Sequence, residues 1–209
     1  MDTKKLIAHN LLKINAIKIS PANPFTWASG LKAPIYCDNR KSLFHHEIRT
    51  IIRDAYVETV REHFPEVEVI AGVATGAIAQ GVLVADKMSL PFIYVREKPK
   101  EHGLKKIIEG DSPKGKNVAV IEDLISTGGS SLKVVNELRK EGAEVLGMVA
   151  IFTYEFDAAI KNFEENSCKL VTLSDFTTLI EQAVEDGLIQ KSDLSVLRKW
   201  HDAPDKFFV

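Results

Sequence analysis

Apolar and polar residues alternate along the chain in blocks that predict strands and helices taking turns. Short runs rich in Val, Ile and Ala predict buried strands, and the segments between them place apolar residues at the spacing of a helix. The predicted strands are 67–72, 92–95, 117–121, 145–152 and 170–173. The predicted helices are 45–63, 77–87, 129–141, 158–166, 176–186 and 192–200. Apolar strands separated by helices are typical of a mainly parallel sheet covered on both faces, so the predicted fold class is α/β.

The first 41 residues follow a different pattern. Residues 3–15 predict an amphipathic helix, and residues 17–20 predict a short strand. From 21 to 41, Pro and Gly interrupt a series of aromatic residues, which predicts an irregular or hairpin segment. The interrupting residues are Pro21, Pro24, Gly30 and Pro34, and the aromatic residues are Phe25, Trp27 and Tyr36. A long segment of this kind is more often functional than not.

The composition predicts one folded, soluble domain. Of the 209 residues, 45% are hydrophobic and 27% are charged, which supplies material for a core and lacks the signature of a disordered chain. The 27 basic and 29 acidic residues give a net charge of −2, which provides no general attraction for nucleic acid or for an acidic membrane. An anionic partner must therefore be met by a local group of residues.

The sequence carries no signal for a membrane, a metal cluster or a disulfide. No apolar run approaches the ~18 residues of a membrane span, and the N-terminus has no apolar signal core, so we expect a cytoplasmic protein without membrane contact. Cys37 and Cys168 are far apart and have no Cys or His partner at metal-ligand spacing. We expect both to be reduced thiols.

The strand predicted at 117–121 leads into the most informative motif. Glu122 and Asp123 follow it, and then Ser126–Ser130 (STGGS) opens a helix. Hydroxyls and glycines at a helix N-terminus leave main-chain N–H groups free to surround a phosphate. Adjacent carboxylates suit the two hydroxyls of a sugar, or a divalent cation held through water. Together they predict a sugar-phosphate site, whereas a plain helix cap followed by a solvated turn is the alternative reading.

Two further strand ends point to the same edge of the predicted sheet. Small residues at 73–77 let a ligand approach the main chain closely, although they are equally common where a strand packs tightly against a helix. Residues 96–110 carry five basic side chains and His102, with Pro99 and Gly103 opposing a long helix. We interpret this segment as a mobile loop that supplies positive charge and excludes water, with a solvated run of charge as the alternative.

These motifs are similar to those of a known family. The run VIEDLISTGGSS resembles the 5-phosphoribosyl-1-pyrophosphate (PRPP) motif of the type I phosphoribosyltransferases. The run FTWASGLKAPIYCDNR, at 25–40, resembles the N-terminal segment of the orotate phosphoribosyltransferase family, and residues 96–110 resemble that family's flexible catalytic loop. The resemblance extends from about residue 16 to residue 152.

The resemblance implies roles for individual residues. It implies PRPP contacts from Arg96, Lys100, His102, Thr75, Gly76, Glu122, Asp123, Leu124, Ile125, Ser126, Thr127, Gly128, Gly129 and Ser130. It implies orotate contacts from Ser126, Phe25, Lys32 and Tyr36, and catalytic roles for Lys100, His102 and Asp123. A single domain over 1–209 follows, with an N-terminal hood and base pocket at about 1–44, a PRPP-binding core at about 45–155, and C-terminal helices with a strand at about 156–209.

The implied reaction transfers ribose 5-phosphate from PRPP to orotate and releases pyrophosphate, as in pyrimidine biosynthesis. Mg²⁺ is the implied cofactor, held mainly by substrate pyrophosphate and water, and a homodimer with shared active sites is the implied assembly. Some members of the family have Lys at the positions of Ala28, Gly76 and Glu97, and an orotate-binding Arg near 153–155. Lys32 or the main chain of 25–29 is therefore the candidate for holding the orotate carboxylate.

Two alternatives to this function are a purine phosphoribosyltransferase and a PRPP-sensing regulator without turnover. The 25–40 segment and the 96–102 loop disfavour the purine enzyme. A regulator of this kind would carry an additional basic DNA-binding domain, and fewer than 30 residues precede the aromatic segment. We therefore expect no nucleic acid partner.

Overall fold

The structure is a computed structural model that describes residues 2–27, 29–96 and 107–207. Its centre is a six-stranded sheet with the strand order β10-β9-β8-β5-β6-β7. The strands are β5 (Val69–Val73), β6 (Phe92–Val95), β7 (Ile108–Glu109), β8 (Asn117–Ile125), β9 (Glu144–Thr153) and β10 (Leu170–Asp175). All neighbours run parallel except β6 and β7, which pair antiparallel. The predicted α/β class with a mainly parallel sheet is confirmed.

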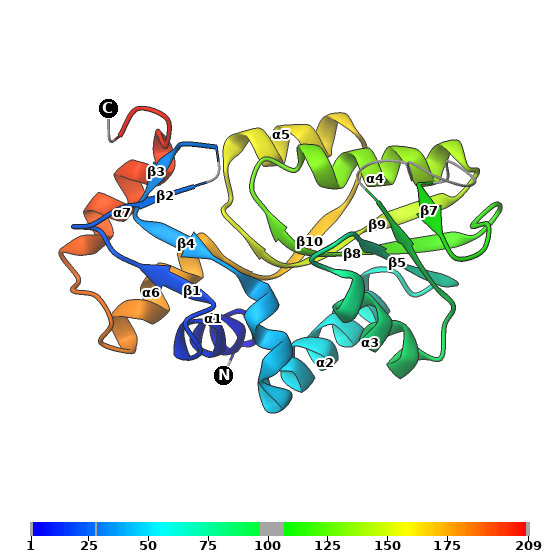
Figure 1. The fold of residues 1–209 in the computed structure, drawn as a ribbon, viewed down its shortest axis with the longest axis horizontal. Coiled ribbons are helices and arrows are strands. Elements are labelled where there is room, and N and C mark those ends of the chain that lie inside the picture. The colour runs from blue at the N-terminus through cyan, green and yellow to red at the C-terminus, as the bar shows by residue number, and fades with distance from the viewer. Residues whose placement is uncertain (1, 28, 97–106, 208–209) are drawn as a thin grey trace.

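Helices cover both faces of this sheet (Figure 1). One face carries α1 (Thr3–Lys13), α2 (His46–His63) and α3 (Ile78–Met88), and the other carries α4 (Gly129–Lys140) and α5 (Asp157–Glu165). The C-terminal helices α6 (Phe176–Glu185) and α7 (Asp193–Asp202) lie at the end of the sheet where α1 packs on β10 and α6. The result is the three-layer arrangement that a parallel sheet requires, because each face must be shielded from water.

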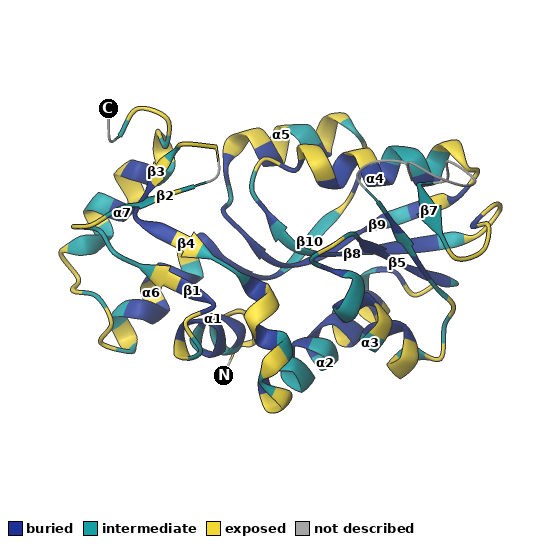
Figure 2. Ribbon diagram, viewed as in Figure 1, coloured by how far each residue is buried: buried dark blue, intermediate teal, exposed yellow. Residues whose placement is uncertain are grey.

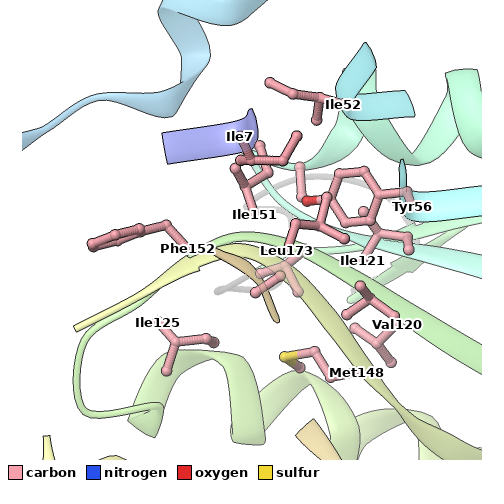
Figure 3. Packing of buried hydrophobic residues seen from close by; sticks show 14 of the residues in the cluster. Ile7, Ile52, Tyr56, Val120, Ile121, Ile125, Met148, Ile151, Phe152 and Leu173 are labelled. Atoms are coloured by element: carbon pink, nitrogen blue, oxygen red, sulfur yellow. The ribbon is translucent and has the colours of Figure 1, made fainter. Parts of the chain in front are cut away.

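The core lies between the sheet and its two helical layers (Figures 2 and 3). Strands β5 and β8 are buried along most of their length, as expected for central strands covered on both sides. Successive residues of β8 point to opposite faces, so Ile121 packs with Tyr56 of α2 while Val120 lies near Met148 (Figure 3). The near-continuous Val, Ile and Ala runs of the sequence correspond to this double burial.

The N-terminal segment forms two small antiparallel sheets beside the core. Strand β1 (Ile17–Ile19) pairs with β4 (Ile35–Cys37), and the hairpin β2 (Phe25–Thr26) and β3 (Lys32–Ala33) lies between them in the chain. A 3₁₀-helix, η1 (Asn39–Phe44), follows and leads into α2. The predicted hairpin segment is confirmed, whereas η1 was not predicted. Among the described residues no helix combines the length and apolarity needed to cross a bilayer.

The two main differences from the sequence prediction are the length of β8 and the presence of β7. Strand β8 was predicted to end at residue 121, but it extends to Ile125 because β9 pairs with it as far as Thr153, whereas its pairing with β5 stops at Gly72. Residues 108–109 were predicted as part of a loop, but they form β7, where Ile108 pairs with Val95. Both extensions come from partner strands that are distant in sequence and give no local signal.

Candidate active site

The acid pair lies inside β8, in the part of the strand that extends beyond β5. Asp123 is half-buried and faces a cavity of about 430 Å³, whereas Glu122 is only 5% exposed. The Glu122 carboxylate accepts hydrogen bonds from its neighbour's main-chain N–H at 2.9 Å and from the Ser131 hydroxyl at 2.7 Å. Burial, with the nearby Asp123 carboxylate, raises the pKa of Glu122 from 4.5 to about 8. At neutral pH the Glu122 carboxyl therefore keeps its proton.

Three strand ends meet at this cavity, as the sequence predicted. Its wall includes Gly76 after β5, Arg96 after β6, and Asp123 in β8. Gly76 is fitted closely, because a Cβ added there would lie 2.6 Å from Cγ of Asp123. The Arg96 guanidinium lies 3.5 Å from the Glu109 carboxylate. Thr75 lies in the turn between β5 and α3, next to a cis peptide bond with Ala74.

The loop Ser126–Ser130 opens helix α4. Gly128 is the N-cap with φ of +78°, and no side chain caps this end, so the first N–H groups of the helix have no capping partner. Helix α5 supports the loop, because the Asn162 side-chain amide donates to the carbonyl of Thr127 at 2.9 Å. A Cβ at Gly128 would lie 2.6 Å from the Phe163 ring, so only glycine fits here. This geometry is that of an anion cradle.

A second, smaller cavity of about 170 Å³ adjoins the first. Trp27, Tyr36, Cys37, Leu124, Ser126 and Tyr154 line it. Its volume is below the ~300 Å³ at which ordinary ligand pockets begin, which suits a single small ring. Leu124 lines both cavities, so the ring-sized cavity and the cavity at the acid pair meet across β8.

An aromatic cluster holds the wall of the ring-sized cavity in place. The Trp27 ring lies 5.0 Å from that of Tyr154 and 6.0 Å edge-on from that of Trp200 in α7. The Trp27 indole N–H donates to the carbonyl of Ile35 at 2.9 Å. His201 stacks on Phe176 at 4.7 Å, and its Nε2 lies 2.7 Å from the carbonyl oxygen of Tyr154. The C-terminal helix is thus part of the support of this wall.

Most of the predicted site residues come together here, but not all do so in the same way. Tyr36 and Ser126 line the ring-sized cavity. Phe25 lies on the adjacent hairpin, with its ring centroid 5.9 Å from that of Tyr36. Lys32 is exposed on the same hairpin. The side chain of Ile125 lies in the core, and its carbonyl accepts a hydrogen bond from the Tyr154 N–H at 3.0 Å. Thr127 lines a neighbouring cavity of about 690 Å³, and Ser130 lines the 430 Å³ cavity. The predicted residues Lys100 and His102 lie outside the described residues.

Several residues of these walls were not among the residues predicted from the sequence. Lys133 of α4 lines the 430 Å³ cavity, and Cys37 and Tyr154 line the smaller one. The spacing in the sequence could have indicated Lys133, because it follows Ser130 by three positions and helical spacing puts both on one side of α4. No pattern in the sequence indicated Tyr154, since its position at the cavity depends on how β9 ends beside the N-terminal segment.

The carboxyl groups at the 430 Å³ cavity decide how the site could hold a divalent cation. In the chain outside positions 1, 28, 97–106 and 208–209, no group of three or more His, Cys, Asp or Glu side chains could hold a metal ion. The carboxyl groups of Glu122, Asp123 and Glu137 line the cavity beside the cradle. One or two carboxylates suit an Mg²⁺ ion that takes most of its ligands from substrate phosphates and water.

Known proteins are similar to this chain in sequence and in fold. The phosphoribosyl transferase domain family matches residues 40–185. The orotate phosphoribosyltransferases of Porphyromonas gingivalis and Streptococcus mutans are each 54% identical to this chain, over 201 residues (96% of both chains) and 202 residues (97% of both chains). The crystal structure of orotate phosphoribosyltransferase from Aeropyrum pernix is 27% identical with a TM-score of 0.76, over 88% of this chain and 99% of that one.

A more distant structure shares the fold alone. Adenine phosphoribosyltransferase from Leishmania donovani has a TM-score of 0.62 and 22% identity, over 83% of this chain and 81% of that one. The two relatives at 54% identity cover nearly the full chain, including the N-terminal segment that the family model does not reach. The chain therefore belongs to the phosphoribosyl transferase domain family and, within it, to the orotate phosphoribosyltransferases.

Proposed function

We propose that this protein transfers ribose 5-phosphate from PRPP to orotate, forming orotidine 5-monophosphate and pyrophosphate. The observation that carries the proposal is the pair of adjoining cavities that share Leu124. One is sized for a single ring, and the other contains the acid pair beside a phosphate cradle. A base and a sugar phosphate bound in these two places would meet at the boundary between them.

The chemistry is a displacement at the anomeric carbon of the sugar. The bond from this carbon to the pyrophosphate oxygen breaks, and a bond to the orotate nitrogen forms. Catalysis then depends on holding the two reactants in line and on stabilising the leaving group, and it needs no covalent nucleophile.

Each part of the site has a distinct task in this reaction. The N–H groups of 126–130 bind the 5-phosphate, Asp123 accepts hydrogen bonds from the ribose hydroxyls, and Arg96 and Lys133 face the pyrophosphate. Asp123 would help to hold Mg²⁺, which would neutralise pyrophosphate charge when bound. From the resemblance, Lys100 and His102 would act on the leaving group, and they lie outside the described residues.

Base selectivity is the test that separates orotate from purines. We expect the purified protein with PRPP and Mg²⁺ to consume orotate, seen as a loss of its ultraviolet absorbance, and to leave adenine and hypoxanthine unchanged. The reason is that relatives 54% identical to this chain over nearly its full length are named orotate phosphoribosyltransferases. Turnover of a purine base without turnover of orotate would contradict the proposal.

The homodimer implied by the resemblance has a candidate contact surface. Phe44, at the end of η1, is 89% exposed, and Val82 of the neighbouring helix α3 is 45% exposed. Gln80 of α3 donates to the Ser42 hydroxyl of η1 at 3.2 Å, so the two elements lie side by side. Phe44 is the most exposed large apolar side chain among the described residues, and exposed apolar surface of this kind favours contact with another protein. We propose that a second copy of the chain covers Phe44.

This surface can be tested by the size of the protein in solution. We expect the wild type to sediment as a dimer and Phe44→Asp to sediment as a monomer, because a charge there would be buried without a partner. Ile160→Asp is the matched control, since Ile160 is 51% exposed on α5, which covers the opposite face of the sheet. A monomeric wild type, or a dimeric Phe44→Asp, would reject this surface.

A further inference from the structure

The main chain of the acid pair is held by two side chains from outside the PRPP motif. The Tyr56 hydroxyl in α2 donates to the carbonyl of Glu122 at 2.5 Å, and the Asn39 amide in η1 donates to the carbonyl of Asp123 at 2.7 Å. Tyr56 is 0% exposed and Asn39 is 1% exposed. Burial, with the nearby Asp123 and Glu122 carboxylates, raises the pKa of Tyr56 well above 10, which keeps its phenol protonated as a donor.

These two bonds occur where β8 has lost its neighbour on one side. Pairing between β5 and β8 ends at Ile121, opposite Gly72, so Glu122 and Asp123 have no ladder partner in β5. A buried carbonyl without a hydrogen bond is costly, which makes the two donors part of what fixes the strand here. The position of the strand must be accurate at this point, because the Asp123 carboxylate fits tightly against Gly76.

Asn39 also contacts the wall of the ring-sized cavity. Its Oδ1 accepts from the Cys37 thiol, with Sγ 3.2 Å away, and Cys37 lines that cavity. Burial raises the pKa of the Cys37 thiol well above 9, so the thiol keeps the proton that it donates. The Ser42 hydroxyl donates to the carbonyl of Asn39 at 2.6 Å, and Gln80 of α3 donates to that hydroxyl at 3.2 Å. Hydrogen bonds therefore fix Asn39 on several sides, and Asn39 connects the wall of the ring-sized cavity to the acid pair.

We propose that Asn39 and Tyr56 are positioning residues that hold the acid pair through its main chain, and that Asn39 additionally couples the ring-sized cavity to the sugar site. This inference rests on the proposed function for the identity of the two substrates. A shift of about 1 Å at a reacting group can cost a large factor in rate, so a hydrogen bond that fixes a carbonyl can act on catalysis without touching the substrate.

The test compares Tyr56→Phe and Asn39→Ala with two matched controls. Ser174→Ala removes a hydroxyl that is 0% exposed and that donates to the carbonyl of Lys4 at 3.0 Å. Asn10→Ala removes an amide that is 7% exposed and that donates to the carbonyl of Leu6 at 2.8 Å. Each control loses one hydrogen bond from a buried side chain to a main-chain carbonyl outside β8. The measurements are kcat, the separate KM values for PRPP and orotate, the Kd for PRPP by calorimetry, and the melting temperature.

The two variants are expected to differ from each other as well as from the controls. Tyr56→Phe should raise the PRPP KM and Kd about tenfold and leave the orotate KM unchanged, because it touches the sugar side alone. Asn39→Ala should raise both KM values and lower kcat. The controls should lower the melting temperature to a similar extent and change neither KM. If Asn39→Ala does not fold, Asn39→Asp replaces it, because it keeps the size and loses the donated bond.

Several outcomes would overturn the inference. Unchanged KM values in both variants, at a loss of melting temperature similar to that of the controls, would reduce both residues to a structural role. A change in the PRPP KM alone for Asn39→Ala would reject the coupling. Failure of the proposed function is a separate result: the wild type would then consume no orotate, and the PRPP Kd of Tyr56→Phe would still decide whether Tyr56 positions the sugar site.

Discussion

Replacing Gly76 with alanine is expected to lower kcat/KM about 100-fold while the protein still folds. The added Cβ would lie 2.6 Å from Cγ of Asp123, so the carboxylate must move away from the cavity. The Gly76 main chain does not have a positive φ, so alanine introduces no backbone strain of its own. Steady-state kinetics and a thermal melt of the same sample measure the two effects.

A double-mutant cycle shows whether this effect acts through Asp123. Asp123→Ala removes the atoms that the new methyl group would meet. If the clash is the cause, adding Gly76→Ala to Asp123→Ala should change kcat/KM no further, because the two substitutions act on one group. A further loss equal to that of Gly76→Ala in the wild type would show that Gly76 acts independently of Asp123.

Replacing Glu122 with glutamine should remove a pH dependence of stability. The raised pKa of Glu122, about 8 against 4.5, means that the folded state holds a proton that the unfolded state releases. The stability that comes from this proton is fully present below about pH 4.5 and is lost as the pH rises through 8. We expect the free energy of unfolding of Glu122→Gln, relative to that of the wild type, to rise by on the order of 3 kcal/mol between pH 5 and pH 9.

The measurement is denaturant unfolding without substrate across this pH range. Glu144→Gln is the control, because Glu144 lies exposed at the start of β9 and its side chain is far from the acid pair in the strand register. The control should follow the wild type at every pH. Parallel curves for Glu122→Gln and the wild type would mean that the Glu122 carboxyl carries no proton in the folded protein at neutral pH.

The sequence was sufficient to predict the parts of the site that are local. Gly76 and the Ser126–Ser130 loop each follow a strand and precede or open a helix, and the acid pair lies in the last part of β8. The geometry of a parallel sheet places such residues at one edge. Gly76, the acid pair and Ser130 of the loop line one cavity. The same local pattern gave the alternation of strands and helices and hence the fold class.

The missing parts depend on contacts between segments that are distant in the chain. Asn39 meets Asp123 across 84 positions, and Tyr56 meets Glu122 across 66. Trp27 approaches Trp200 because the N-terminal and C-terminal segments pack at the same end of the sheet. Hydrophobic periodicity reports which face of an element is buried, but it does not report what lies opposite that face. The predicted length of β8 was wrong for the same reason, because the strand is extended by its pairing with β9.

Matched release of pyrophosphate and loss of orotate tests the central claim most directly. The wild type with PRPP, Mg²⁺ and orotate should release one pyrophosphate for each orotate consumed, with orotidine 5-monophosphate as the only nucleotide product. Asp123→Asn, which keeps the shape of the side chain and removes its charge, should lose most of this turnover at an unchanged melting temperature. Pyrophosphate release that is independent of orotate, or full turnover by Asp123→Asn, would contradict the account.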